Sequence, residues 1–207
     1  LVANSKNIQG RIKKFYRRES VVIYPPVENS NYKSQMTNEI QKSKFQKDYY
    51  LVVSRIVGSK GWELLYGLGK KYKIIVAGRA INQSGEEIVQ KLKNSNIEYL
   101  GEVTEEKKWE LMAGAKGFLC LSRDEDFGIS AVEAQMCGTP VIAYNGGGYP
   151  ETVIHKKTGI LFDEYSAMGL IRAIREMGEI GWNREVIKKH AQKFSKENFV
   201  KKILNNL

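Results

Sequence analysis

Two carboxylates, Glu125 and Glu133, frame a short turn near the middle of the chain. The turn leads into a helix expected at residues 130–137, and the N–H groups in the first turn of a helix suit a phosphate. Residues 127–129 form this turn, in which Gly128 removes the side chain that would block a close approach. Because carboxylates repel phosphate, we expect the two Glu side chains to bind hydroxyl groups on either side of it. Either Glu alone is as easily an ordinary surface or capping acid.

A second loop without side-chain bulk follows the next apolar run. It contains Gly146 and Gly147, followed by a third glycine. Ligands of open α/β sheets bind beyond the carboxyl ends of the strands, so both loops are expected at one crevice. Two such loops suit a diphosphate better than a single phosphate.

Two cations follow another apolar run. Arg55 and Lys60 come just after a strand expected at residues 49–54. Arginine offers a two-pronged donor and lysine a point charge for phosphate oxygens. They are expected to reach the same crevice, although two loop cations can also be merely solvated.

The elements that must position these residues alternate between strands and helices. Apolar runs predict strands at residues 49–54, 73–77, 97–100, 117–121, 141–144 and 159–162. Helical periodicity predicts helices at residues 62–70, 86–94, 105–115, 130–137, 167–179 and 182–194. This alternation predicts an α/β fold, a doubly wound, Rossmann-like domain with a six-stranded parallel sheet.

The two ends lie outside this alternation. Residues 1–19 are expected to form a basic amphipathic helix with Ser5 as N-cap, followed by a strand at residues 21–24. Residues 29–47 are polar and predict a linker. The domain is then expected over residues 48–194, with a last helix at residues 195–207. A basic amphipathic helix is usually a solvated face, but it can also lie on a membrane.

Composition limits the function classes. The 207 residues carry a net charge of +10, which suggests an anionic partner without naming it. There is no RNA-binding motif with interleaved aromatics, so no nucleic-acid partner is expected. Cys120 and Cys137 are expected to be buried free thiols, which favours a cytoplasmic protein. With two histidines and no paired ligand spacing, no metal site is expected.

The motifs form an ordered series that resembles a known family. The two glutamates enclose FGI, EAQMCGTPVIAYNGGGYPETV begins at Glu133, and HKKTGILF lies beyond. This series resembles the C-terminal, donor-binding half of retaining GT-B glycosyltransferases, in particular the large family 4 group. The opening residues 1–28 resemble the segment that leads from the N-terminal to the C-terminal domain. Residues 195–207 resemble the helix that crosses back to the N-terminal domain.

The resemblance implies a role for each site residue. Glu125 would hold hydroxyls of the transferred sugar, and Glu133 those of the ribose. The backbone amides of Phe127, Gly128 and Ile129 would meet the diphosphate. Arg55 and Lys60 would neutralise the leaving nucleoside diphosphate, so with Glu125 they are the expected catalytic residues. Residues of the predicted base pocket, acting mostly through backbone groups, are Gly78, Arg79, Gly101 and Val103.

The resemblance also implies a reaction. A hexose would pass from a nucleotide sugar to an acceptor hydroxyl with retained anomeric configuration, without a metal cofactor, in polysaccharide biosynthesis. VVIYPPVE resembles family members that use GDP-mannose, so mannosyltransferase is the first expectation. A glucosyltransferase, meaning a glycogen- or sucrose-type synthase using ADP- or UDP-glucose, and a non-catalytic nucleotide-sugar-binding module stay open.

The expected partners follow from the same resemblance. They are a nucleotide sugar, a saccharide or lipid-linked saccharide acceptor, and the N-terminal GT-B domain, which is expected to be missing from this chain. The basic ends leave a peripheral contact with the cytoplasmic face of the membrane open.

Overall fold

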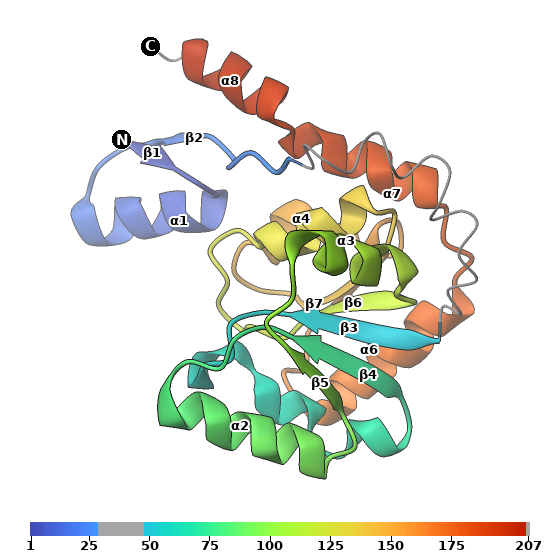
Figure 1. Cartoon of the computed structure of the whole chain (residues 1–207). Helices are drawn as coiled ribbons and strands as arrows, with labels where there is room; N and C mark the ends of the chain where they lie inside the picture. Colours follow the sequence, from blue (N-terminus) through green and yellow to red (C-terminus); the bar gives the residue numbers. More distant parts are fainter. Residues whose placement is uncertain (29–47, 206–207) are drawn as a thin grey trace.

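The computed structural model describes residues 1–28 and 48–205. Its centre is a six-stranded parallel sheet with the order β5-β4-β3-β6-β7-β8 (Figure 1). The strands are β3 (Tyr49–Val53), β4 (Lys73–Ala77), β5 (Glu98–Gly101), β6 (Gly117–Cys120), β7 (Val141–Tyr144) and β8 (Gly159–Phe162). Along the chain, this sheet starts at the central strand β3 and extends outward to β5; it then continues from β6, on the other side of β3, outward to β8. The predicted doubly wound fold is confirmed.

Helices cover both faces of the sheet. In Figure 1, α3 (Glu105–Gly114) and α4 (Ile129–Met136) lie above it, while α2 (Asn82–Asn94) and α6 (Ala167–Glu179) lie below it. Successive strand residues point to opposite faces. Leu51 therefore packs in the core under α3 and α4, whereas Val52 packs in the core over α2 and α6. Both strand faces are buried, which explains the continuous apolar runs in the sequence.

The prediction of one helix at residues 62–70 is wrong. This segment forms two 3₁₀ turns, Trp62–Leu65 and Leu68–Lys70. Gly67 separates them in a left-handed conformation, with a φ of 85°. A Cβ at Gly69 would lie 2.3 Å from the Ser95 carbonyl oxygen, so the chain runs against that backbone. Trp62 and Leu65 are nevertheless buried, as an amphipathic pattern requires.

The helix expected at residues 1–19 is only partly correct. The chain begins with strand β1 (Val2–Ala3), which pairs in parallel with β2 (Val21–Val22). Ser5 caps α1 (Lys6–Arg11), as predicted, and accepts a hydrogen bond from the Ile8 N–H at 3.1 Å. A π-helical turn (Ile12–Tyr16) follows and ends at Arg17, which has a left-handed φ of 53°.

The remaining helices are short. These are α5 (Tyr149–Thr152), α7 (Arg184–Ala191), a 3₁₀ turn (Gln192–Phe194) and α8 (Lys196–Leu204). The helix expected at residues 182–194 begins later because the Asn183 side chain caps it. The predicted linker at residues 29–47 lies outside the described residues. None of the helices in the two described ranges combines the length and apolar character needed to cross a membrane.

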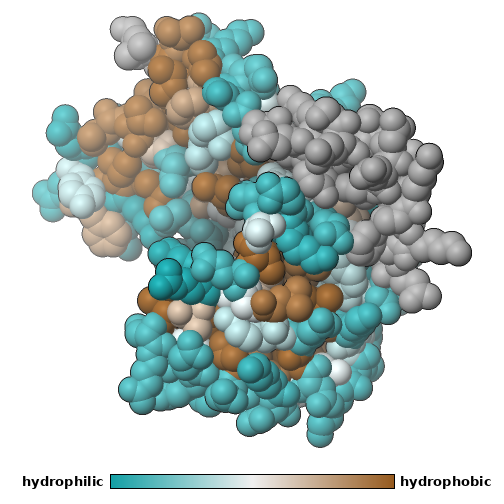
Figure 2. Space-filling model, viewed as in Figure 1, coloured by the Kyte–Doolittle hydropathy of each residue, from teal (hydrophilic) through white to brown (hydrophobic). Residues whose placement is uncertain are grey.

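The N-terminal segment and α8 share one side of the molecule. Figure 1 places both chain ends there. Figure 2 shows apolar surface over β1, β2 and α8. The exposed apolar side chains on this side include Leu1, Val2, Val21 and Leu204.

Candidate functional site

A cleft of about 280 Å³ opens where β3 and β6 end. Residues 52–55 form one wall, and residues 119–122 form the other. β3 and β6 are neighbours in the sheet, and the order of the strands reverses between them. Doubly wound proteins bind ligands at the carboxyl edge of such a switch point. The fold therefore makes this cleft the candidate site.

The cleft brings together residues that lie far apart in the sequence. The predicted site residues that line it are Arg55, Lys60, Glu125, Ile129 and Glu133. Those that lie outside its lining are Gly78, Arg79, Gly101, Val103, Phe127, Gly128, Gly146 and Gly147. All three predicted catalytic residues, Arg55, Lys60 and Glu125, thus meet in one place.

The amino end of α4 borders the cleft. Gly128 is its N-cap, with a φ of 92° that favours glycine, and no described side chain caps the helix. The Gly128 carbonyl accepts the N–H groups of Ala131 and Val132 at 3.1 and 3.3 Å. The N–H groups before them have no partner within the helix, and the helix dipole makes this end partly positive. Ile129 and Ser130 carry them to the cleft.

Phe127 has a different role from its neighbours. Its side chain is buried, and its ring packs against Tyr24 and Phe194 with centroids 5.5 and 5.3 Å away. The ring thus anchors the turn to Tyr24, which follows β2, and to the 3₁₀ turn before α8. Only its backbone amide remains for the role that was predicted.

Lys60 and Glu125 form an ion pair in the cleft. Lys60 Nζ donates to Glu125 Oε2 at 3.0 Å, and the two side chains are 25% and 24% exposed. The 3₁₀ turn Gly58–Lys60 and the left-handed Gly61 place Lys60 there. A Cβ at Gly61 would lie 2.2 Å from the Leu121 carbonyl oxygen. Only glycine lets this loop approach the end of β6 so closely.

The triple-glycine loop (residues 146–148) packs on the backbone of Glu125. The Gly148 N–H donates to the Glu125 carbonyl at 2.7 Å. A Cβ at Gly147 would lie 2.4 Å from the same oxygen. The absence of side chains thus serves close packing, and it fixes the loop that carries Glu125. Ligand contacts by Gly146 and Gly147 stay predictions.

Glu133 pairs with a lysine that the sequence did not single out. Lys108, on α3, donates to Glu133 Oε1 at 2.9 Å, and its Nζ lies 2.8 Å from Glu105 Oε2. Burial raises the pKa of Glu133, while the hydrogen bond from Lys108 lowers it. Burial alone would lower the pKa of Lys108, but its two glutamate partners raise it. Burial thus favours the neutral form of Glu133, and Lys108 opposes that shift beside the cleft.

Glu151 binds the N-terminal segment. Its oxygens accept the N–H groups of Lys6 and Asn7 at 2.8 and 2.9 Å and the Tyr24 hydroxyl at 3.0 Å. The carboxylate thus caps the start of α1. Asn7 in turn reaches the Glu125 carbonyl with its Nδ2 at 3.4 Å.

The predicted base-pocket loops follow β4 and β5. The Gly78 N–H donates to the Gly101 carbonyl at 2.7 Å, and the Tyr99 hydroxyl donates to the Gly78 carbonyl at 2.9 Å. Arg79 is exposed and Val103 half-buried. Gly78 also lies against the carbonyl of Ser54, which lines the cleft. Contact of these loops with a base stays a prediction.

Several cleft residues escaped sequence reasoning. They are Ser54, Trp62, Cys120, Ser122, Ser130 and Tyr149. Ser130 and Tyr149 directly follow the glycine-containing turns, and that position was a usable signal. Burial raises the pKa of Tyr149 well above its ordinary value, so it acts as a neutral hydroxyl.

The two cysteines agree with the sequence reasoning. Cys120 and Cys137 are buried and free, as predicted. Within residues 1–28 and 48–205, no three His, Cys, Asp or Glu side chains gather as a metal-binding group. Whether the site works without a metal stays a prediction.

The sequence matches one protein family. The pattern described as "Glycosyl transferases group 1" matches residues 35–194. An uncharacterized glycosyltransferase of Methanocaldococcus jannaschii is 27% identical over 201 residues, which cover 95% of this chain and 54% of that protein. The chain spans about half the length of the first relatives that it matches.

Solved structures share the fold. A glycosyltransferase from Rickettsia africae superimposes with a TM-score of 0.80 at 21% identity, covering 99% of this chain and 61% of that one. Anabaena HepE, in complex with UDP and glucose, superimposes with a TM-score of 0.78 at 22% identity, with the same coverage. Both likenesses concern the fold, which is that of the GT-B glycosyltransferases.

Proposed function

Because the chain belongs to the glycosyl transferases group 1 family, we propose that it is the donor-binding half of a retaining hexosyltransferase. In this proposal, the cleft binds a nucleoside diphosphate sugar, with mannose as the first candidate sugar. The hexose passes to a hydroxyl of a saccharide or lipid-linked saccharide. The acceptor site belongs to an N-terminal GT-B domain, for which the apolar side formed by β1, β2 and α8 is a suitable contact surface (Figure 2).

One observation carries the proposal. Two cations, Arg55 and Lys60, and the uncapped end of α4 meet two carboxylates, Glu125 and Glu133, in a cleft at the switch point of the sheet. A positive helix end and two cations suit a diphosphate. Carboxylates at the edge of the same cleft suit hydroxyl groups, which a nucleotide sugar presents on both sides of its diphosphate. A ligand with only one of these groups would leave half of the site unused.

The proposed chemistry is electrostatic. As the bond between the sugar and the diphosphate breaks, negative charge grows on the leaving phosphate. Arg55, Lys60 and the amides at the start of α4 would stabilise this charge without having to reorganise. Each well-placed donor of this kind contributes roughly 2.7–4 kcal/mol to catalysis. The same groups would take the place of a metal ion, so we propose that no metal is required.

The position of Lys60 limits how it can bind the diphosphate. Its ammonium group is already hydrogen-bonded to Glu125 at 3.0 Å. In the proposed complex, Lys60 therefore bridges Glu125 and the diphosphate. Glu125 is then placed beside the carbon at which the sugar leaves, where its second oxygen is available to sugar hydroxyls.

The donor has a second candidate. A glucosyl donor, carried by UDP or ADP, is favoured by the likeness in fold to the Anabaena structure with UDP and glucose. GDP-mannose is favoured by the VVIYPPVE stretch. A module that binds a nucleotide sugar without transferring it is the alternative outside catalysis.

The proposal extends to the surroundings of the enzyme. We propose a cytoplasmic location, supported by two buried free thiols. A lipid-linked acceptor would bring the protein to the membrane face. The exposed Phe15 and Tyr16, with basic residues on both sides, would then contact anionic lipid.

Two variants test the division of roles in the cleft. Glu133→Ala is expected to weaken the binding of GDP and GDP-mannose alike, because it removes the acceptor for ribose hydroxyls. Glu125→Ala is expected to spare GDP and to weaken only the additional binding that mannose provides. Calorimetric titration of both variants with both ligands, and with UDP and UDP-glucose in parallel, measures this. If the two variants lose the same binding, the assignment of the two carboxylates is wrong.

A further inference from the structure

Lys108 is a partly buried cation next to a residue of the cleft. It lies on α3, and its side chain is only 13% exposed. Its Nζ lies 2.9 Å from Glu133 Oε1 and 2.8 Å from Glu105 Oε2. Lys108 itself does not line the cleft, whereas Glu133 does. The lysine therefore contacts the site only through the carboxylate.

The ion pair with Lys108 offsets the free-energy cost of removing the Glu133 carboxylate from water. Glu133 is only 16% exposed, and a carboxylate at such a place is unfavourable unless it is paired. Burial raises its pKa, and Lys108 opposes that shift through its hydrogen bond and its charge. Without Lys108, the protonated form of Glu133 would gain. That form offers hydroxyl groups a weaker acceptor.

The geometry also fixes the direction of the carboxylate. One oxygen of Glu133, Oε1, is held by Lys108 from α3. Among the described residues, none donates a hydrogen bond to the other oxygen, Oε2. Glu105, an exposed residue one turn before Lys108, holds the lysine from its other side. The chain Glu105–Lys108–Glu133 thus leaves Glu133 with one occupied oxygen and one that can face a ligand.

We propose that Lys108 is a positioning residue that aims the carboxylate of Glu133 at the vicinal hydroxyls of a ribose. The inference rests on the proposed function, which gives Glu133 to the ribose. It adds that a residue of α3, outside the cleft, sets how strongly the site selects ribonucleotides. Lysine suits the task because its compact ammonium group binds two carboxylates at once.

A purely structural role would look different in one measurement. If Lys108 only joined α3 to α4, its loss would weaken every nucleotide by the same factor. If it aims Glu133, its loss weakens only ligands that carry the 2′- and 3′-hydroxyls. The ratio between the affinity for a ribonucleotide and that for its 2′,3′-dideoxy form separates the two roles.

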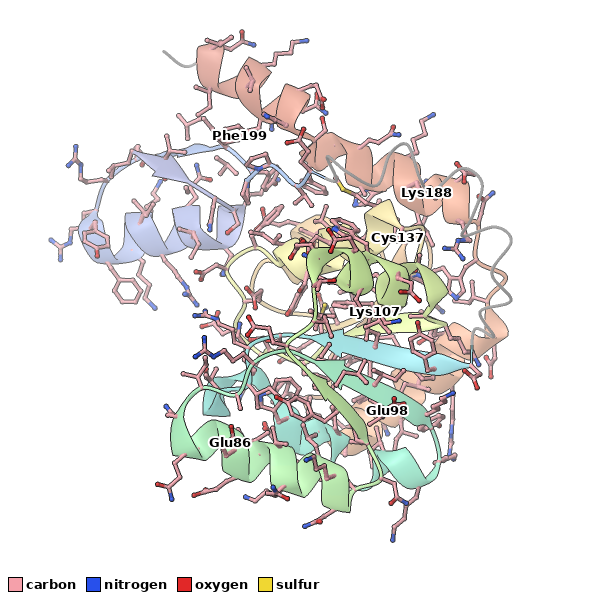
Figure 3. All side chains as sticks on the ribbon, in the orientation of Figure 1. Glu86, Glu98, Lys107, Cys137, Lys188 and Phe199 are labelled. Atoms are coloured by element: carbon pink, nitrogen blue, oxygen red, sulfur yellow. The ribbon has the colours of Figure 1, made fainter. Side chains whose placement is uncertain are left out.

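The experiment is a calorimetric titration of the full chain with GDP and UDP and with their 2′,3′-dideoxy forms. The variants are Lys108→Met, which keeps the length of the side chain, Lys108→Arg and Glu133→Gln. Lys107→Met is the matched control. Lys107 is labelled on α3 in Figure 3 and pairs with Glu110 at 3.0 Å. Thermal unfolding of each variant checks that it is folded.

The wild-type chain is expected to prefer the ribonucleotide by about tenfold or more, the value of a hydrogen bond to a charged group. Lys108→Met and Glu133→Gln are both expected to remove most of this preference and to leave dideoxy binding within about twofold of wild type. Lys108→Arg, which keeps the charge, and the control Lys107→Met are both expected to keep the wild-type preference for the ribonucleotide.

The experiment distinguishes a failure of the role proposed for Glu133 from a failure of the role proposed for Lys108. If Glu133→Gln keeps the preference for ribose, or if the wild-type chain binds none of the nucleotides, the proposed function of Glu133 is wrong and the inference falls with it. If Glu133→Gln loses the preference but a folded Lys108→Met keeps it, only the inference is overturned. An equal loss for ribose and dideoxy ligands in Lys108→Met also overturns it.

Discussion

Replacing Lys60 by methionine separates the binding of a diphosphate from the binding of the rest of a nucleotide. Lys60 is the cation that the structure places beside Glu125, with Nζ and Oε2 3.0 Å apart. Methionine keeps the length of the side chain and removes the charge. We expect Lys60→Met to weaken GDP far more than GMP, because the terminal phosphate is the group that Lys60 would bind.

Two effects contribute to the magnitude, one on binding and one on the stability of the fold. A hydrogen bond to a charged group contributes about 1.5–3 kcal/mol, which is about 10- to 150-fold in the Kd for GDP. The variant also leaves Glu125 without its partner. Both side chains are about three quarters buried, so leaving Glu125 unpaired also destabilises the fold. Thermal unfolding of the variant measures this loss separately from the loss of binding.

The assay is calorimetric titration of GDP and GMP into the wild-type chain and the variant. Lys73→Met is the control, since it removes the same charge at the amino end of β4, where Lys73 pairs with Asp48 at 3.3 Å. It is expected to change neither affinity beyond about twofold, as surface charges contribute little. An equal loss of GDP and GMP binding in Lys60→Met would refute the reasoning, because Lys60 would then contact something other than the diphosphate.

Three further predictions concern the fold, the surface and the reaction. Gly78→Ala places a Cβ 1.9 Å from the Ser54 carbonyl at a φ of 145°, whereas Gly101→Ala meets nothing within 4 Å at a φ of 74°. Both variants add backbone strain of about 1–3 kcal/mol, but only Gly78→Ala also adds a clash, so it is expected to lower the unfolding temperature more than Gly101→Ala does. Equal unfolding temperatures of the two variants would show that the close approach at Gly78 is unimportant. Phe15 and Tyr16 are 69% and 73% exposed. The protein is therefore expected to sediment with vesicles that contain anionic lipid but not with neutral vesicles. The double change Phe15→Ser and Tyr16→Ser should reduce that sedimentation, and binding that persists would place the contact elsewhere. A protein that includes the N-terminal domain is expected to form a product with the donor's anomeric configuration, and an inverted product in the NMR spectrum would contradict the proposed mechanism.

The sheet was predictable because its strands are buried on both faces. A strand such as β7 (Val141–Tyr144) lies between two layers of helices, so its sequence is a continuous apolar run. The glycine-containing turn before α4 was predictable for a related reason, since Gly128 adopts a conformation that other residues avoid. Local rules of this kind need no knowledge of distant contacts.

Other features depended on distant contacts and were missed. Lys108 and Glu133 are 25 residues apart and lie on different helices, so no local pattern connects them. Glu151 caps a helix that is 144 residues away. The segment that contains Trp62 has helical periodicity, but left-handed glycines on either side of it impose 3₁₀ turns.

The beginning of the chain shows the same limit. The basic pattern of residues 1–19 predicts one helix, yet Val2 and Ala3 pair with β2 through contacts almost twenty residues away. The N-cap at Ser5 was nevertheless predicted correctly, because a cap depends only on the three residues that follow it.

The central claim is that the cleft at the ends of β3 and β6 binds a nucleoside diphosphate through cations and backbone amides, without a metal. Calorimetric titration of the chain with GDP, UDP and ADP in the presence of a chelator tests it most directly. We predict that one of the three binds clearly better than the other two, with GDP first, and that added Mg²⁺ does not strengthen the binding. Failure of all three to bind, or binding that appears only with Mg²⁺, would contradict the account.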